Sequence, residues 1–410
     1  MRTLVVTRWA PWPPTSGARH RSANVIAALA DLGEVDVFLL VDPRLEDELT
    51  PPPGLQLGKV GRAPRATPGA GRLERLRSMV PGARPAAIRL QEDGAARAAF
   101  AAWGPRSYDL AWFVRIESWL ALAPLVDAPA VIDYDDLRDQ LVRSRLRSAW
   151  QDPPGSIDMS TLARRARRRL VGDADARAWA RLQRRTSRDV QTVVVCSEID
   201  RQRLGVANAA IVPNGADLPA EPVGRATVGS PPTLCLHGSL NYGPNADAAA
   251  VLVRDVAPRV RALVPDVTVR LVGRTDQRVA RLAGTPGVVV TGPVPDITTE
   301  LAQADVVVVP LRQGAGTRIK ILEALAHRVP VVATSIAVEG LDAVHGEHLL
   351  VADDPERFAE ACVDLLRGVE LRARLADAGE RLARERYGWE HARAAVTRLA
   401  TEVVGNTGRP

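Results

Sequence analysis

The sequence predicts an α/β protein with two doubly wound, Rossmann-like domains, each built on a parallel sheet with helices on both faces. Three observations support this. A chain of 410 residues is too long for one hydrophobic core and fits two domains of about 150 to 200 residues each. Both halves alternate continuously apolar runs with helical patterns, as a buried parallel sheet requires. A segment rich in proline, glycine and alanine, at 213–232, separates the two series.

The first domain is expected at residues 1–213. A strand at 3–7, a loop at 8–20, an amphipathic helix through 22–33 and a strand at 35–40 predict a βαβ unit. Further strands are expected at 109–113, 130–134, 192–196 and 210–212. Proline and glycine dominate 51–71, which predicts a loop without fixed structure, whereas 155–188 has a largely helical pattern.

The second domain is expected at residues 226–388 and repeats the alternation. Its predicted strands lie at 233–237, 267–272, 287–291, 305–309, 330–333 and 348–351. Helical patterns follow at 355–367, 370–385 and 390–403. Because both series read as parallel sheets, ligands are expected at the carboxyl ends of the strands.

Cysteine content and hydropathy limit the class of protein. Cys196, Cys235 and Cys362 are far apart, odd in number and not part of a Cys-x-x-Cys motif, so we expect no zinc site. Cys196 and Cys235 lie in apolar runs and are expected to be core residues in a reducing compartment. No run approaches the roughly 18 apolar residues of a membrane span, and the first strand begins at once. We therefore expect a cytoplasmic protein.

Residues 306–333 carry the most informative pattern: an apolar strand, a glycine-bearing loop, a helix and a second strand. Gly314 and Gly316 would let the backbone approach a ligand, and the helix N-terminus would offer N–H groups to an anion. Lys320 is one of only two lysines among 54 basic residues, and it shares a helix face with Glu323. The cation suits phosphate and the carboxylate suits ribose hydroxyls. The alternative is a solvated ion pair.

Charge is concentrated between residues 138 and 188. This stretch has 14 arginines and five aspartates, a net charge of +9 in a chain of net +6. A solvated helical face is the favoured interpretation. The alternative is contact with anionic headgroups at a membrane surface, and nucleic-acid binding is the weakest because few aromatic residues accompany the arginines.

Several motifs together resemble those of group-1 retaining glycosyltransferases of the GT-B fold. They are PPTSGARHR at 13–21, IVPNGADL at 211–218, LHGSLNYGPNADA at 236–248, GAGTRIKILEALA at 314–326 and VEGLDAVHGEHLLVADDPERFA at 338–359. The chain looks most like bacterial sugar transferases with a G-x-G-T-R-x-K-x-L-E helix. The resemblance implies two Rossmann-like domains facing a central cleft, with a last helix, at about 389–405, packed back onto the first.

The resemblance also implies a function. It implies transfer of a sugar from a nucleoside-diphosphate sugar, held mainly by the second domain, to a hydroxyl of a glycan, a lipid-linked acceptor or a small molecule. No cofactor beyond the donor is expected. No metal is expected either, since no Asp-x-Asp pair follows a strand in the second half. An epimerase of the same fold and a non-catalytic binding protein remain as alternatives.

The resemblance assigns roles by residue. Glu323 is expected on the donor ribose, and Ala315 stands where the family has an acid that contacts the sugar. Arg318 and Lys320 would grip the phosphates and stabilise the leaving group. The remaining expected donor contacts are Gly17, Gly238, Gly314, Gly316 and Thr317.

Candidate residues on the acceptor side are less specific. Asp133, Asp135 and Asp136 follow a strand and are expected to orient an acceptor hydroxyl or to act as a base, although a helix cap explains them equally well. His20 is a candidate for phosphate or sugar contact, with an exposed loop histidine as the alternative. Arg115 or Glu117 stands where the family often has a histidine. Asn214 and Gly215 are expected to be structural turn residues.

Overall fold

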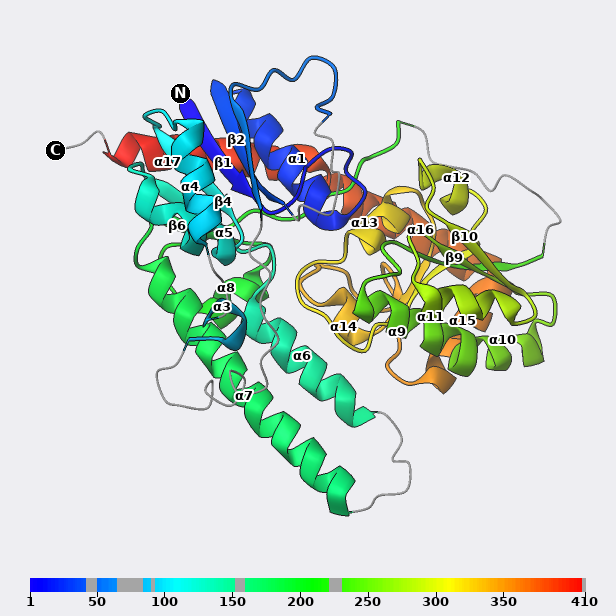
Figure 1. The fold of residues 1–410 in the computed structure, drawn as a ribbon. Helices are drawn as coiled ribbons and strands as arrows, with labels where there is room; N and C mark the ends of the chain where they lie inside the picture. Colours follow the sequence, from blue (N-terminus) through cyan, green and yellow to red (C-terminus); the bar gives the residue numbers. More distant parts are fainter. Residues whose placement is uncertain (42–49, 65–83, 90–92, 152–158, 221–230, 408–410) are drawn as a thin grey trace. The chain divides into compact units, whose positions relative to one another are not determined.

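The computed structural model describes residues 1–41, 50–64, 84–89, 93–151, 159–220 and 231–407. These residues form two compact units (Figure 1). The first comprises Met1–Pro213 together with Ala392–Pro410, and the second comprises Asn214–His391.

The first unit is built on a seven-stranded parallel sheet with the order β3-β2-β1-β4-β5-β6-β7. Its strands are β1 (Arg2–Thr7), β2 (Glu34–Val41), β3 (Val60–Pro64), β4 (Leu110–Val114), β5 (Ala130–Asp133), β6 (Thr192–Val195) and β7 (Ala209–Ile211). Its helices are α1 (Gly17–Ala30), α3 (Ala86–Arg89), α4 (Gly94–Trp103), α5 (Ile116–Leu122), η1 (Ala123–Leu125), α6 (Arg138–Gln151), α7 (Met159–Ser187) and α8 (Glu198–Leu204). The apolar central strands are almost wholly buried, as expected for a parallel sheet that helices cover on both faces.

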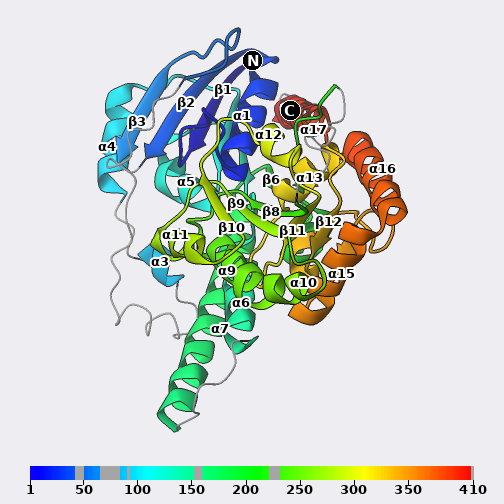
Figure 2. The same ribbon diagram turned by 90° about the vertical axis from the view of Figure 1, so that its right-hand side faces the viewer.

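The second unit repeats this topology with six parallel strands in the order β10-β9-β8-β11-β12-β13. Figure 2 labels β10, β9, β8, β11 and β12 of this sheet. The strands are β8 (Thr233–His237), β9 (Thr268–Val272), β10 (Val288–Gly292), β11 (Val306–Val309), β12 (Val331–Ala333) and β13 (Leu350–Val351). The helices are α9 (Gly243–Val251), η2 (Leu252–Val256), α10 (Ala257–Leu263), α11 (Gln277–Ala280), η3 (Arg281–Gly284), α12 (Thr298–Leu301), α13 (Ile319–Ala326), α14 (Ser335–Val338), α15 (Pro355–Arg367) and α16 (Val369–Arg386). Helix α17 (Trp389–Thr407) begins in this unit and belongs to the first unit from Ala392 onward.

Strand order locates the functional edge of each sheet. In both sheets the chain first builds outward in one direction and then returns to the other side of its first strand. The reversal lies between β1 and β4 in the first unit and between β8 and β11 in the second. Ligands of doubly wound proteins bind beyond the carboxyl ends of the strands at such a point. The loops after these four strands therefore hold the candidate sites.

The predicted strands are confirmed to within about two residues, except at the edge of the first sheet. Residues 51–71 were expected to form a loop, but β3 pairs in parallel with β2. Glycine and proline are both depleted in strands, so Gly61 and Pro64 favoured a loop in the sequence. In the structure glycine is required at 61, because a Cβ there would lie 2.4 Å from a ring carbon of Phe38, and Pro64 is tolerated because β3 is an edge strand. Residues 65–71 lie outside the described part of the chain, as do 155–158 of the predicted helical segment.

Two further expectations can be compared with the fold. Helix α1 starts at Gly17, several residues earlier than expected, so Gly17 and His20 belong to its first turns and not to a loop. All three cysteines are buried and free, which confirms the prediction of core positions for Cys196 and Cys235. No helix in the described part of the chain is long and apolar enough to cross a membrane.

Candidate functional site

The loop between β11 and α13 ends at the positive end of a helix. Arg318 occupies the N-cap, so α13 starts at Ile319 and its first backbone N–H groups lack helical partners. The buried face carries Ile319, Leu322 and Ala326, as the periodicity predicts. Lys320 and Glu323 lie on the other face and are half-buried. The helix thus presents a cation and a carboxylate at the reversal point of the second sheet.

Glycines on both loops make room for the cations. Gly238, which follows β8, has φ +121°, and Gly314 has φ +146°, values that side-chain-bearing residues rarely adopt. A Cβ on Gly238 would lie 3.2 Å from Lys320 Nζ, and one on Gly314 would lie 2.3 Å from Arg318 Nη2. Gly316 also has positive φ, at +76°. The loop after β8 therefore lies against Lys320 and the loop after β11 against Arg318, and these two cations are close enough to repel each other.

Lys320 is held in place by an amide. Its Nζ donates to Asn245 Oδ1 at 2.9 Å, and Asn245 Nδ2 donates to the Ser239 carbonyl at 2.9 Å, which fixes the orientation of the amide. Burial, reinforced by the nearby Arg318 guanidinium and opposed by Glu323, lowers the pKa of Lys320 to about 7. An anion beside Nζ would restore the ordinary, higher value, because it favours the charged amine.

Glu323 lies between Lys320 and a buried histidine. Burial raises the pKa of Glu323 to about 7 against the opposing charge of Lys320, and Asp217 adds to the rise. His237 ends β8, and its Nδ1 lies 3.6 Å from Glu323 Oε2, which is too long for a hydrogen bond. Burial, with the charge of Lys320, lowers the pKa of His237 to about 3, so the ring is neutral at neutral pH.

The residues that precede α13 complete this set. Thr317 Oγ1 is buried and has no hydrogen-bond partner among the described residues. Arg318 folds back over its own loop, where Nη1 donates to the carbonyls of Ala315 and Gly316. Arg318 therefore shapes the loop and places a second positive charge near Lys320. A buried hydroxyl without a partner is costly unless something binds it, so Thr317 indicates a ligand position.

Asp133 needs a correction as a candidate base on the first unit. Its side chain is fully buried at the end of β5, and both carboxylate oxygens accept from the Arg21 guanidinium at 2.9 to 3.1 Å. Arg21, itself 2% exposed, also donates to the Val212 carbonyl. An enclosed carboxylate paired on both oxygens is a structural partner, so we do not include Asp133 among the acting groups.

A second charged cluster lies at the reversal point of the first sheet, where β1, β4 and β5 end. Arg115 pairs with Asp135 at 2.9 Å and with Asp136 at 3.3 Å, and its guanidinium lies 5.2 Å from the centre of the Trp9 ring. Glu117 pairs with Arg8 at 3.1 Å and with Arg138. Burial raises the pKa of Glu117, but Arg138, Arg8 and Arg115 outweigh it and hold the pKa at about 2. We call these residues the β4 cluster.

Two observations mark the β4 cluster as more than a set of ion pairs. Three of its buried atoms, Arg115 Nε, Glu117 Oε2 and Asp136 Oδ1, have no hydrogen-bond partner among the described residues. Arg115 and Asp135 also have positive φ, at 71° and 56°, and only Arg328 shares this among described non-glycine residues. Backbone strain and unpartnered polar atoms are typical of binding sites.

The other candidates on the first unit have ordinary surroundings. Gly17 is the first residue of α1 and is helical, without the positive φ of Gly238. His20 lies one turn into the same helix and is half-buried, with its carbonyl accepting from the Asn24 side chain at 2.9 Å. Both stand at the N-terminus of α1, beyond β1. Their expected ligand contacts stay predictions.

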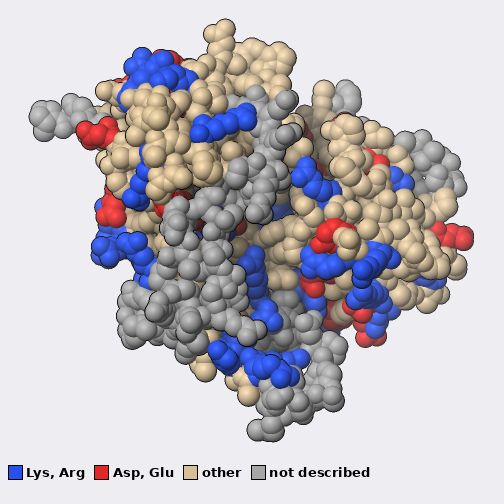
Figure 3. Space-filling view, viewed as in Figure 1, with Lys and Arg blue, Asp and Glu red and all other residues tan. Residues whose placement is uncertain are grey.

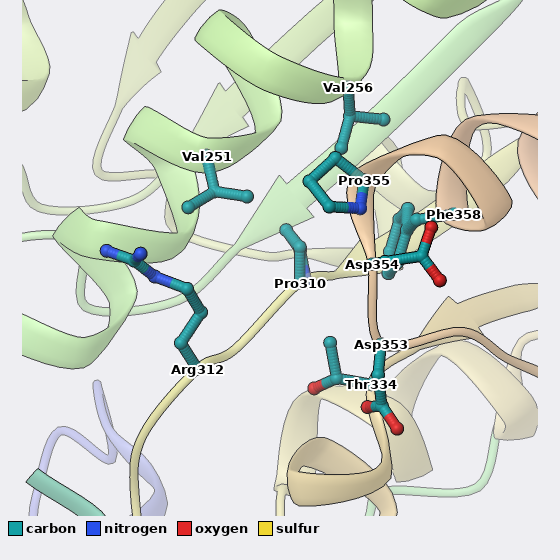
Figure 4. A pocket seen from close by; sticks show the side chains of 9 residues that line it. All are labelled: Val251, Val256, Pro310, Arg312, Thr334, Asp353, Asp354, Pro355 and Phe358. Carbon is teal, nitrogen blue, oxygen red and sulfur yellow. The ribbon is translucent and has the colours of Figure 1, made fainter. Parts of the chain in front are cut away.

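A separate pocket lies on the second unit (Figure 4). Its lining includes Thr334, Asp353 and Arg312, and Arg312 is paired with Asp247 at 2.5 to 3.0 Å. Its volume of about 50 Å³ suits one or two water molecules and is far below that of a nucleotide site. Within the described residues, no group of three or more histidine, cysteine, aspartate or glutamate side chains is placed to hold a metal ion.

Sequence reasoning missed four contributors. His237 reads as part of an apolar strand, and Asn245 as an ordinary helix residue, because their relation to α13 depends on the order of the strands. Arg8 and Arg138 were likewise not singled out as site residues, although Arg8 directly follows β1 and Arg138 is the first residue of α6. The signal that was available is position: all four lie near the carboxyl end of a strand or the start of the next helix.

Comparison with known proteins finds a family match within the second unit. Residues 231–368 match the family described as glycosyl transferases group 1. A phosphatidyl-myo-inositol mannosyltransferase from Mycobacterium leprae is 30% identical over 214 residues, which are 49% of this chain and 55% of that protein. An uncharacterised 44.6 kDa protein in the cps region of Klebsiella pneumoniae is 37% identical over 60 residues, 15% of this chain and 16% of that protein. The chain thus matches about half the length of one curated relative and about a sixth of the other.

Solved structures match over nearly the whole chain. Sucrose-phosphate synthase from Thermosynechococcus elongatus has a TM-score of 0.71 at 17% identity, covering 99% of this chain and all of that one. HepE from Anabaena, in complex with UDP and glucose, has a TM-score of 0.63 at 16% identity, with 98% and 99% covered. WaaG, a glycosyltransferase of lipopolysaccharide biosynthesis, has a TM-score of 0.60 at 13% identity, with 99% and 100% covered. At these identities the likeness shows the fold, which is GT-B.

Proposed function

We propose, from the group-1 glycosyltransferase domain at residues 231–368 and the GT-B fold of the chain, that this protein transfers a sugar from a nucleoside-diphosphate sugar to a hydroxyl acceptor. The observation that carries the proposal is the meeting of Thr317, Lys320 and Glu323 at the reversal point of the second sheet. These three groups match the parts of a nucleoside diphosphate. We further propose retention of the anomeric configuration, which the family resemblance supports.

On the donor side, charge complementarity assigns the roles. Lys320, Arg318 and the N-terminus of α13 provide positive potential for the diphosphate, and the Thr317 hydroxyl can donate to a phosphate oxygen. Glu323 accepts from the ribose hydroxyls. As the bond to the sugar breaks, negative charge grows on the departing diphosphate, and these fixed groups stabilise that charge. We propose that no resident metal or cofactor is required, so a chelator should leave the rate unchanged.

On the acceptor side, the β4 cluster offers what a hydroxyl needs. A hydroxyl both donates and accepts, and the cluster has one donor, Arg115 Nε, and one acceptor, Glu117 Oε2, without a hydrogen-bond partner among the described residues. Asp136 Oδ1 also lacks a hydrogen bond there, although it lies 3.3 Å from Arg115 Nη1 in an ion pair. We propose that these groups bind and orient the acceptor. The strained backbone at Arg115 and Asp135 supports this, because strain is retained where a site requires it.

The acceptor class is proposed from the relatives. One relative is named for a phospholipid acceptor and one structural neighbour for lipopolysaccharide biosynthesis, so we propose a lipid-linked acceptor. Such an acceptor would bring the protein to an anionic membrane surface, where the arginines of 138–188 can meet headgroups. We propose the cytoplasm as the compartment, which the three free cysteines support.

The test is direct detection of the product. A panel of nucleoside-diphosphate sugars, beginning with UDP-glucose because HepE binds it, is screened for thermal stabilisation and then incubated with lipid and sugar acceptors. We expect an acceptor that gains the mass of one sugar, with an anomeric proton coupling that shows retention. Isomerisation of the donor without an acceptor would identify an epimerase. Tight donor binding without transfer to any acceptor would refute the transferase proposal.

Asp136→Asn tests the acceptor side. The change keeps the shape of the side chain but removes the charge beside Arg115 and turns one acceptor into a donor. We expect the KM for the acceptor to rise about tenfold or more, a loss typical of one charged hydrogen bond, while donor affinity stays unchanged. Asp127→Asn, the same change at an exposed position of the same unit, is the control. An equal loss of donor and acceptor binding would contradict the assignment.

A further inference from the structure

Helices α6 and α7 form a hairpin whose far end does not pack on the sheet. Both views show the pair extending away from the strands of the first unit (Figure 1) (Figure 2). The 29 residues of α7 correspond to about 43 Å of helix. Its carboxyl-terminal half is anchored, with Ala176 and Trp179 buried and the Gln183 carbonyl accepting from the Tyr134 hydroxyl. Farther out, α7 is in contact with α6, where a Cβ on Gly172 would lie 2.5 Å from Leu146.

Arginines predominate at the far end of the hairpin. We define the hairpin end by Arg145 and Arg147 on α6 and by Arg164, Arg165, Arg167, Arg168, Arg169 and Leu170 on α7. Every described side chain from 163 to 170 is exposed except Arg165, which is half-exposed. No aspartate or glutamate occurs among the described residues between 140 and 172. In Figure 3, blue side chains lie toward the bottom of the view, where the hairpin extends.

The composition of the hairpin end selects one kind of partner. Guanidinium groups bind phosphate oxygens in a bidentate manner, so the arginines suit a partner that presents phosphates. Leu170 is 60% exposed among these arginines, an apolar side chain that suits the interface of a bilayer. Among the side chains of the hairpin that the structure describes, none offers an exposed aromatic platform for base stacking, since Trp179 is buried.

We propose that the hairpin end docks on the surface of an anionic phospholipid bilayer. This deepens the proposed function, because a membrane surface is where a lipid-linked acceptor would be found. The contact is electrostatic, so it is expected to weaken strongly with salt as the screening length falls. Each arginine brought to an anionic surface contributes about fivefold to binding, so removal of four should reduce binding by two orders of magnitude or more.

The experiment compares two variants that lose the same number of charges. Arg147, Arg165, Arg167 and Arg168 are changed together to glutamine, which keeps helix propensity. The control changes Arg254, Arg281, Arg381 and Arg398, all exposed and outside the hairpin, to glutamine. Circular dichroism verifies that both variants are folded. Co-sedimentation is then measured with vesicles of phosphatidylcholine alone and with added phosphatidylglycerol, without donor or acceptor, so the result does not depend on transferase activity.

The proposal predicts binding only to the vesicles with phosphatidylglycerol, loss at high salt, loss of at least 100-fold in the hairpin variant and near-normal binding in the control. Equal loss in both variants would mean that net charge alone matters, which would overturn the proposal. So would absence of vesicle binding by the unmodified protein. Binding to duplex RNA that is tighter than to vesicles at the same salt, and lost in the hairpin variant, would assign the surface to nucleic acid instead.

Discussion

Lys320→Gln is expected to lower kcat/KM for the sugar donor by about 10²- to 10³-fold, the usual cost of removing one fixed group that stabilises a developing anion. The side chain is held by Asn245 and lies beside Arg318 and the N-terminus of α13, where the diphosphate is proposed to bind. Steady-state kinetics and calorimetry with the best donor of the panel measure the effect. Lys59→Gln is the control, because Lys59 is the other lysine of the chain and binds the carbonyls of Trp103 and Gly104. Equal donor kinetics in the two variants would refute the assignment of Lys320 to the donor phosphates.

The same site predicts how donor affinity changes with pH. Phosphate binds the protonated amine, and the pKa of Lys320 in the free protein is lowered to about 7. Binding therefore takes up a proton above pH 7. The contribution of Lys320 to affinity is full below this pH and falls as the pH rises, with a loss that approaches tenfold per pH unit. Lys320→Arg should abolish this fall, since a guanidinium stays protonated. A fall that persists unchanged in Lys320→Arg would place its cause at another group.

Asp133→Ala is expected to destabilise the first unit by about 3 to 5 kcal/mol, because it leaves the buried Arg21 charge without a partner. Burial alone would lower the pKa of Arg21, but Asp133 and its neighbours keep it above the ordinary value, which measures how strongly the pair holds its charge. Scanning calorimetry measures the loss. Glu198→Ala breaks an exposed pair with Arg201 on the same unit and should cost far less stability.

A double variant separates a structural role from a catalytic one. Arg21→Met together with Asp133→Leu replaces the pair by apolar side chains and should recover most of the stability. If Asp133 is only the partner of Arg21, transfer activity of this folded double variant stays within a few-fold of the unmodified protein. A stable double variant without activity would show that Asp133 or Arg21 takes part in the reaction.

The strands and the placement of Lys320 and Glu323 on α13 were predictable because their signals are local. Buried strands of a parallel sheet are continuously apolar, and the glycines, Lys320 and Glu323 all fall within ten residues of each other. The start of α1 was placed too late, because the proline-rich residues before Ser16 read as a longer loop than the structure shows. The edge strand β3 was missed for a similar reason, since its glycine and proline weaken the strand pattern.

What the sequence did not reveal depends on distant residues. Arg21 and Asp133 are 112 positions apart, so nothing local shows that the aspartate is already paired. His237 comes near Glu323, and Asn245 binds Lys320, only because β8 and β11 are neighbours in the sheet. The β4 cluster likewise assembles from the ends of three strands. Charged residues after a strand can be read from sequence, but their partners follow from the topology.

The central claim is that the loops after β8 and β11 bind the donor diphosphate. Hydrogen–deuterium exchange of the intact protein, with and without a saturating nucleoside diphosphate, tests it most directly. The account predicts slower exchange in peptides that contain residues 312–320 and 237–243, because their backbone N–H groups lie at the proposed anion site. Unchanged exchange in both segments, with protection instead around Thr334 and residues 353–358 at the small separate pocket, would contradict it.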